Sequence, residues 1–132
     1  ICAIRQGGLE AFATDIDIPL KYGVDQCVGD TICAGGIMYA QRGIPVMLDF
    51  CRDIREVAKP GALFINYSNP MAMLTWACNQ YGGVPTVGLC HGVMGAHWQI
   101  THAIEKWAKL SGVIAPDYVS PPTQPGEPTE AS

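Results

Sequence analysis

The stretch Val84–Gly95, VPTVGLCHGVMG, places a short apolar run directly before a Cys-His pair and a glycine-flanked turn. The run Pro85–Leu89 has the length and apolar character of a buried strand, and the apolar spacing over Gly92–Leu110 predicts a helix. A strand that leads into a helix is the building unit of a parallel α/β sheet. We therefore expect Cys90 and His91 to lie at the carboxyl end of a buried strand.

The same alternation extends toward the N-terminus. Ala62–Tyr67, ALFINY, is a second short apolar run, typical of a strand covered on both faces. Met71–Gln80 predicts the helix between the two strands, and Ile37–Ala58 has apolar residues at helical spacing, with Pro45 as a candidate kink. The glycine-rich segment 22–36 predicts a loop.

The N-terminal part completes the pattern. Ile1–Ile4 predicts the end of a further strand, and Leu9–Lys21 predicts a weak helix that Pro19 interrupts. This order of elements predicts an α/β fold, a parallel sheet with helices on both faces. Ligands of such sheets bind beyond the carboxyl ends of the strands, where the turns RQGG, NYSNPM and LCHGV fall.

Composition narrows the class of protein. The chain has 132 residues, 48% of them hydrophobic and 15% charged, with a formal net charge of −4. It offers no basic patch for nucleic acid and no apolar run of the ~20 residues that a membrane span needs. Six cysteines invite a disulfide interpretation, but without a signal peptide we expect reduced, mostly buried thiols in a cytoplasmic protein.

The two ends of the chain carry expectations of their own. The sequence opens within an apolar run and without Met, so we expect an internal segment of a longer protein. After about Val113 it becomes rich in proline. We therefore expect residues 1–112 to form part of one domain and residues 113–132 to be a disordered tail.

Two features at the strand ends are candidates for chemistry. Cys90 and His91 are metal-ligand or catalytic residue types, and a helix N-terminus beside them favours a thiolate. The alternative is that Cys90 is a small apolar strand residue and His91 a polar cap. Asn69 precedes a proline, which excludes the helical region for it, so it is either an N-cap or an amide that points into the strand-end cleft.

The glycine-rich loop and the first turn add further candidates. The loop is long for a compact fold, which is typical of functional or lid-like loops. Asp25 and Asp30 in it are candidate acids, or aspartates that satisfy turns. Arg5 before Gly7 and Gly8 either binds an anion or is solvated.

Taken together, these segments resemble a known family. IPLKYGVDQCVGDT, GGIMYAQRGIP, INYSNPMAM with TWA, and VGLCHGVMG follow one another, from about Ile1 to Leu110, as in the glycoside hydrolase family 4 enzymes. These are NAD- and manganese-dependent glycosidases, and the motifs are most similar to the α-galactosidase branch. The resemblance implies a Rossmann-like domain related to lactate and malate dehydrogenases. It also implies a small-molecule α-glycoside as substrate and a homo-oligomeric parent enzyme.

The resemblance further implies a mechanism outside the two-carboxylate scheme. NAD oxidises the sugar at C3, a base removes the proton at C2, and the glycosidic oxygen leaves by elimination, while Mn²⁺ polarises the sugar oxygens. Cys90 matches the family's metal ligand, His91 the proposed acid, and Asn69 the asparagine that holds sugar hydroxyls. The cofactor-binding residues it implies are Arg5, Gly7, Gly8 and Asn66.

Several departures qualify this expectation. The family's dinucleotide loop, its second metal-ligand histidine and its tyrosine base have no counterpart in the chain, so we expect the isolated chain to be inactive. Apolar Phe12 stands where the phosphosugar branch carries an arginine, which favours an unphosphorylated substrate. The alternatives are an α-glucosidase or α-galacturonidase of the same family, a dehydrogenase, and a non-catalytic βα module.

Overall fold

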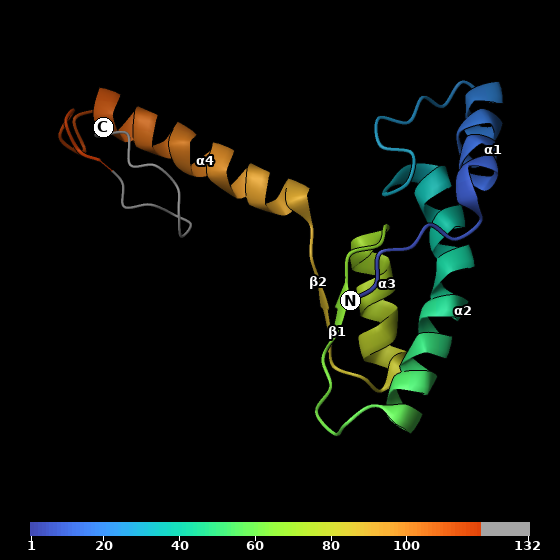
Figure 1. The fold of residues 1–132 in the computed structure, drawn as a ribbon. Coiled ribbons are helices and arrows are strands. Elements are labelled where there is room, and N and C mark those ends of the chain that lie inside the picture. The colour runs from blue at the N-terminus through green and yellow to red at the C-terminus, as the bar shows by residue number, and fades with distance from the viewer. Residues whose placement is uncertain (120–132) are drawn as a thin grey trace. The chain divides into compact units, whose positions relative to one another are not determined.

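The structure, a computed structural model, describes residues 1–119. It consists of two compact units, Ile1–Leu89 and a second unit that begins at Cys90 (Figure 1). The expected division into residues 1–112 and a tail from residue 113 stays a prediction, and residues 120–132 lie outside the described part. Among residues 1–119, no helix is both long enough and apolar enough to cross a membrane.

A parallel sheet forms the centre of the first unit. β1 (Phe64–Asn66) pairs with β2 (Thr86–Gly88), with Phe64 opposite Thr86 and Asn66 opposite Gly88. Both strands are shorter than expected from the sequence. The expected strand 1–4 is reduced to one parallel bridge, in which the Cys2 amide donates to the Ile65 carbonyl at 2.8 Å.

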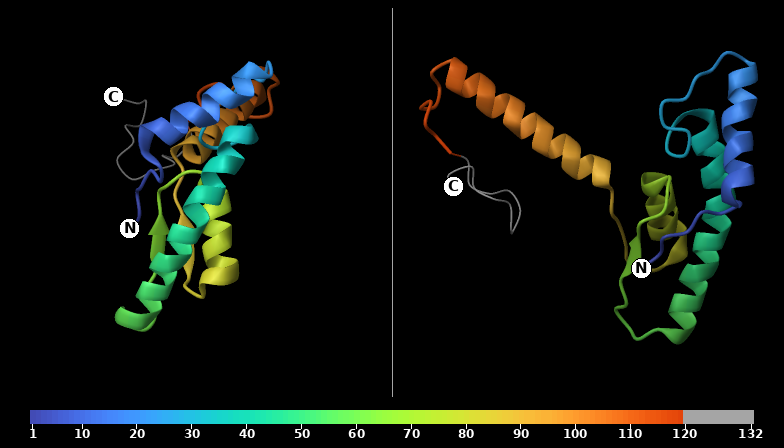
Figure 2. Two further views of the ribbon diagram at one scale, coloured as in Figure 1. Left: turned by 90° about the vertical axis from the view of Figure 1, so that its right-hand side faces the viewer. Right: turned by 45° about the horizontal axis from the view of Figure 1, so that its top comes forward.

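Three helices accompany this sheet. α1 (Gly8–Lys21) packs against α2 (Cys33–Val57), as both views in Figure 2 show. α3 (Met71–Ala77) contacts both strands and α2, and it continues as a π-helical turn, Cys78–Gly82. The connection from β1 through α3 to β2 is the expected βα unit of an α/β fold. Helices on a second face of the sheet stay a prediction.

The core lies between α2, α3 and the strands. Its buried members are Cys2, Met47, Cys51, Phe64, Leu74, Cys78 and Val84. Fully burying a side chain the size of Leu or Met contributes about 1.5–3 kcal/mol, and this set joins α2, β1, α3 and the π-helical turn. All six cysteines are free, as expected, although only three of them are buried.

Two local expectations were wrong. Pro19 does not interrupt α1, because it lies in the last turn of the helix. Proline has no amide hydrogen to donate to the Asp15 carbonyl, and Gln26 Nε2 donates to that carbonyl instead, at 3.0 Å. The loop ends earlier than expected, since α2 already begins at Cys33. Gly35 lies inside α2, where a Cβ would come within 2.7 Å of the Gly29 carbonyl oxygen, so this glycine permits close packing.

The second unit contains α4 (His91–Leu110), which confirms the helix expected after the second strand. It begins directly after Cys90, whose backbone is extended, with φ −140° and ψ 121°. The Glu105–Lys109 ion pair, at 3.0 Å, has the i,i+4 spacing that supports a helix.

Candidate functional site

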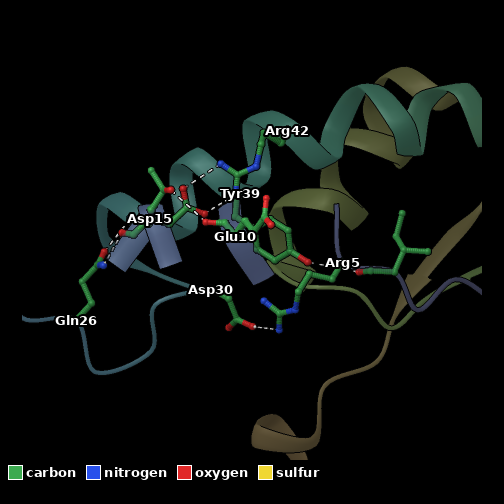
Figure 3. Close-up of polar contacts among 10 residues, drawn as sticks. Arg5, Glu10, Asp15, Gln26, Asp30, Tyr39 and Arg42 are labelled. Atoms are coloured by element: carbon green, nitrogen blue, oxygen red, sulfur yellow. Dashed lines mark hydrogen bonds and ion pairs between the residues drawn. The ribbon is translucent and has the colours of Figure 1, made fainter. Parts of the chain in front are cut away.

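Polar side chains from three segments meet in the first unit, where its strands end. Arg5 follows the Cys2 bridge, Asn69 follows β1, and Asp30 comes from the loop before α2. Arg5 Nη2 donates to Asp30 Oδ2 at 3.1 Å (Figure 3), and Asn69 Nδ2 donates to Asp30 Oδ1 at 3.3 Å. The structure thus brings together three residues that the sequence places in separate turns.

Asp30 is the centre of this group. Its side chain is only 16% exposed, and its Oδ1 also accepts a hydrogen bond from Thr31 Oγ1 at 2.9 Å. Burial raises the pKa of the Asp30 carboxyl, but the bonds from Thr31, Arg5 and Asn69 outweigh it, so the pKa lies below its ordinary value. Asp30 is therefore ionised at neutral pH.

Aromatic rings hold the guanidinium group that faces Asp30. The Arg5 Cζ atom lies 4.6 Å from the centre of the Phe12 ring and 5.5 Å from that of Tyr39. Cation–π contacts of this kind contribute about 0.5–1 kcal/mol at exposed sites. Burial raises the pKa of Tyr39, whose hydroxyl donates to the Ile4 carbonyl at 3.4 Å.

A second ion pair lies on the other side of Tyr39, between Arg42 and Asp15. Arg42 Nη1 donates to Asp15 Oδ1 at 2.9 Å, and its Nη2 contacts the other Asp15 oxygen (Figure 3). This bidentate pair joins α1 to α2, and the Arg42 Cζ lies 5.7 Å from the Tyr39 ring centre. Tyr39 therefore lies between two guanidinium groups, one from each ion pair.

The first turn has the backbone geometry expected of a close-approach site. Gly7 and Gly8 have φ of 87° and 64°, in the left-handed region that favours glycine. A Cβ on Gly7 would lie 2.7 Å from the Ala11 Cβ, whereas one on Gly8 would meet nothing within 4 Å. The start of α1 at Gly8 is thus exposed and uncrowded.

Asn66 and Asn69 have different environments although they lie only three residues apart. Asn66 is fully buried, its Oδ1 accepts from the Ser68 amide at 2.9 Å, and its Nδ2 donates to Thr75 Oγ1 at 3.2 Å. It holds the turn after β1 against α3. Asn69 is half-buried, and a cis peptide bond joins it to Pro70 at the end of the same turn.

The N-cap interpretation of Asn69 was wrong. The residue at the N-cap of α3 is Pro70, and no side chain caps this helix. The Asn69 amide instead points to Asp30, which agrees with the alternative in which it faces the strand ends.

The expected metal ligand and acid lie in the second unit. Cys90 is the N-cap residue of α4 and is partly exposed, and His91 is the first residue of the helix. Over residues 1–119, no group of three or more His, Cys, Asp or Glu side chains is arranged to hold a metal ion. Cys90 and His91 together fall short of the four to six ligands of an ordinary site.

Sequence reasoning missed several residues of the first unit. Asp15, Gln26, Tyr39 and Arg42 were assigned no role, although the last three lie within the segments that resemble the family, and the partners of the two ion pairs lie 25 and 27 positions apart. Such pairs have no signal in a single sequence. Asp30 was recognisable as a candidate acid, but its bond to Asn69 was not.

Comparisons with known proteins agree with this architecture. Residues 1–106 match the family described as Family 4 glycosyl hydrolase. An alpha-galactosidase of Rhizobium meliloti (strain 1021) is 70% identical over 112 residues, which are 85% of this chain and 21% of that protein. An alpha-galactosidase of Bacillus subtilis (strain 168) is 45% identical over 70% of this chain and 22% of its own.

One solved structure shares the fold. The crystal structure of a candidate glucosidase, lplD, from Bacillus subtilis aligns with a TM-score of 0.68 and 32% identity, over 79% of this chain and 24% of that one. The chain spans about a fifth of the length of the curated relatives it matches. The α/β fold is therefore that of a solved structure to which the chain is similar, and the chain belongs to the family 4 glycosyl hydrolases.

Proposed function

We propose that the full-length protein carrying this chain is an α-galactosidase that cleaves O-glycosidic bonds with the help of NAD. The observation that carries the proposal is the 70% identity to the alpha-galactosidase of Rhizobium meliloti over 85% of the chain. The family match over residues 1–106 includes all three strand-end turns, and substrates of α/β sheets bind at such turns.

The surroundings of Arg5 support an unphosphorylated sugar. The Arg5 Cζ atom lies 4.6 Å from the centre of the Phe12 ring, so an apolar ring occupies this position beside the guanidinium and adds no charge. A phosphate group needs charged donors, preferably an arginine fork, and Phe12 offers none. The proposal therefore excludes phosphosugars from the preferred substrates.

Asn69 is the proposed sugar-binding residue of this chain. Its amide lies at the strand ends and is held by an ionised carboxylate, so it can form hydrogen bonds with a sugar hydroxyl without losing its anchor. His91 is the proposed acid: at the start of α4 it would donate a proton to the departing glycosidic oxygen.

The first turn fits a dinucleotide. The start of α1, with the uncrowded Gly8, suits a phosphate-bearing group, because a helix N-terminus favours negative charge. Gly7, Gly8 and Arg5 are the residues we propose to contact NAD, which when bound supplies the oxidant for the sugar. Asn66 is fully buried, so we propose that it supports this cofactor site indirectly, by holding the turn after β1 against α3.

The donor set for manganese is incomplete in the described residues. The Cys90 thiolate is a suitable soft ligand, and we propose it as one ligand of a Mn²⁺ ion. Because residues 1–119 supply no complete site, we derive no step through the metal.

The test uses the full-length protein with p-nitrophenyl α-galactoside, with and without NAD and Mn²⁺. We expect hydrolysis that disappears when the nicotinamide cofactor is removed and returns when it is restored. Hydrolysis that proceeds unchanged without NAD would contradict the proposal. The same assay with α-glucosides and α-galacturonides separates the alternatives, of which an α-glucosidase is favoured by the likeness to the candidate glucosidase from Bacillus subtilis.

A further inference from the structure

The contact between Asn69 and Asp30 determines which end of an amide faces outward. A carboxamide has a donor end and an acceptor end, and its rotation about the last side-chain bond is broad. Asn69 Nδ2 lies 3.3 Å from Asp30 Oδ1. Within residues 1–119, the structure gives Asn69 Oδ1 no hydrogen-bond donor.

The identity of the facing group makes this orientation obligatory. An ionised carboxylate only accepts hydrogen bonds, so the amide nitrogen, and not the oxygen, must face Asp30. The hydrogen bonds from Thr31 and Arg5 keep Asp30 in the ionised form. If Asp30 were absent, neither end of the Asn69 amide would be preferred on this side.

Asp30 is itself held rigidly. Its Oδ2 accepts from Arg5, near the N-terminus, at 3.1 Å, and its Oδ1 accepts from the adjacent Thr31 at 2.9 Å. Arg5 in turn lies over the rings of Phe12 and Tyr39. The carboxylate is therefore fixed relative to the strand ends, although it belongs to a loop.

We propose that Asp30 is a positioning residue that turns the Asn69 carboxamide so that its Oδ1 accepts a hydrogen bond from a sugar hydroxyl. This inference rests on the proposed function, in which Asn69 contacts the sugar. Asp30 acts through Asn69 and transfers no proton. The substrate group it selects is a hydroxyl that donates, rather than one that accepts.

A double-mutant cycle in the full-length protein tests the proposal. Asp30→Ala and Asn69→Ala are made singly and together, and kcat/KM for the α-galactoside is measured with NAD and Mn²⁺ present. We expect each single change to cost on the order of 10- to 100-fold, because misplacing a group that contacts substrate costs this much. In the Asn69→Ala background, we expect Asp30→Ala to cost less than about threefold, since the residue it orients is gone.

Two further variants separate positioning from stability. Asp30→Asn keeps the shape of the side chain and one acceptor oxygen, so we expect a smaller loss than with alanine, and the cycle can be repeated with it if Asp30→Ala fails to fold. Asp17→Ala removes an exposed carboxylate from α1, a residue with no role at the site, and we expect unchanged activity. Losses at Asp30 and Asn69 that multiply fully in the double variant would overturn the proposal, as would full activity of Asp30→Ala.

Neutron crystallography, which distinguishes the amide nitrogen from the amide oxygen, keeps this inference separate from the proposed activity. In the full-length protein we expect Asn69 Nδ2 to face Asp30, and in Asp30→Ala we expect the amide to rotate or to occupy two orientations. An unchanged, single orientation in Asp30→Ala would refute the positioning role whatever the enzyme hydrolyses. If the amide reorients but no α-glycoside is cleaved, the proposed function fails and the positioning role stands.

Discussion

Gln26 provides the sharpest test of how the loop before α2 is held. Its Nε2 donates to the Asp15 carbonyl at 3.0 Å, the group that Pro19 leaves without a helical donor. Its Oε1 accepts from the Gly35 amide at 2.7 Å, one of the first amides of α2, which have no partner within the helix. One side chain thus satisfies a carbonyl in α1, beside Asp15 in Figure 3, and an amide in α2.

The expected cost of Gln26→Ala follows from these two bonds. Each contributes about 1 kcal/mol net, so the variant should lose about 2 kcal/mol. Since 1.4 kcal/mol corresponds to a tenfold change in an equilibrium constant, local opening should become roughly 30-fold more frequent. Hydrogen exchange followed by mass spectrometry on the full-length protein measures this directly, in peptides that cover residues 32–40.

Two variants serve as controls for this experiment. Gln26→Glu keeps an acceptor for the Gly35 amide but cannot donate to Asp15, so we expect protection at the start of α2 to persist while the end of α1 exchanges faster. Gln41→Ala changes an exposed glutamine on α2, and we expect no effect. If Gln26→Ala accelerates exchange in residues 32–40 by less than about threefold, the two hydrogen bonds of Gln26 do not stabilise this segment and our reasoning is wrong.

Two further predictions concern the core. In Gly88→Ala the new Cβ would collide with Met71 and lie 2.5 Å from Thr75 Oγ1, so we expect the free energy of unfolding to fall by about 1–3 kcal/mol, measured as a lower Tm. Gly95→Ala is the control, because a Cβ there meets nothing within 4 Å and should not lower the Tm. Burial, together with Cys51, raises the pKa of the Cys78 thiol from 9.0 to about 12. Below pH 9 the thiol is protonated in both states, but between pH 9 and 12 only the unfolded chain loses its proton, so the free energy of unfolding should fall there by up to about 1.4 kcal/mol per pH unit. Cys78→Ala should flatten this fall in alkaline urea titrations, and equal slopes in both proteins would count against a buried neutral thiol.

The sequence predicted the elements of the fold well because their signals are local. The apolar spacing of 37–58 and the short run 62–67 each depend on neighbouring residues, and both elements are present, as α2 and β1. The helix boundaries were predicted less accurately where a glycine allows close packing inside a helix instead of forming a turn. Gly36, for example, was read as part of a loop, yet in α2 a Cβ there would lie 2.6 Å from the Thr31 carbonyl carbon.

The candidate site was predictable only in part, for a different reason. Asn69 and Arg5 occupy the turns where strands end, and topology alone places such turns at one edge of a parallel sheet. Their common partner Asp30 comes from a loop, and the distance along the chain between Arg5 and Asp30 leaves no pattern to detect. The Asp15–Arg42 pair is hidden in the same way, since its two residues lie 27 positions apart and no local pattern links them.

The loop before α2 is best understood as the element that carries Asp30 to the strand ends. Ordering each residue of a loop costs about 1–2 kcal/mol in backbone entropy, and a loop that only connected two helices could be shorter. Here Gln26 fixes its first half between α1 and α2, while Thr31 and Arg5 fix the carboxylate at its end. Glycine at position 35 lets the loop backbone approach α2 closely enough for these bonds. The loop therefore holds the Asp30 carboxylate in a fixed position. Among the described residues, two strand-end side chains donate to this carboxylate, Arg5 and Asn69.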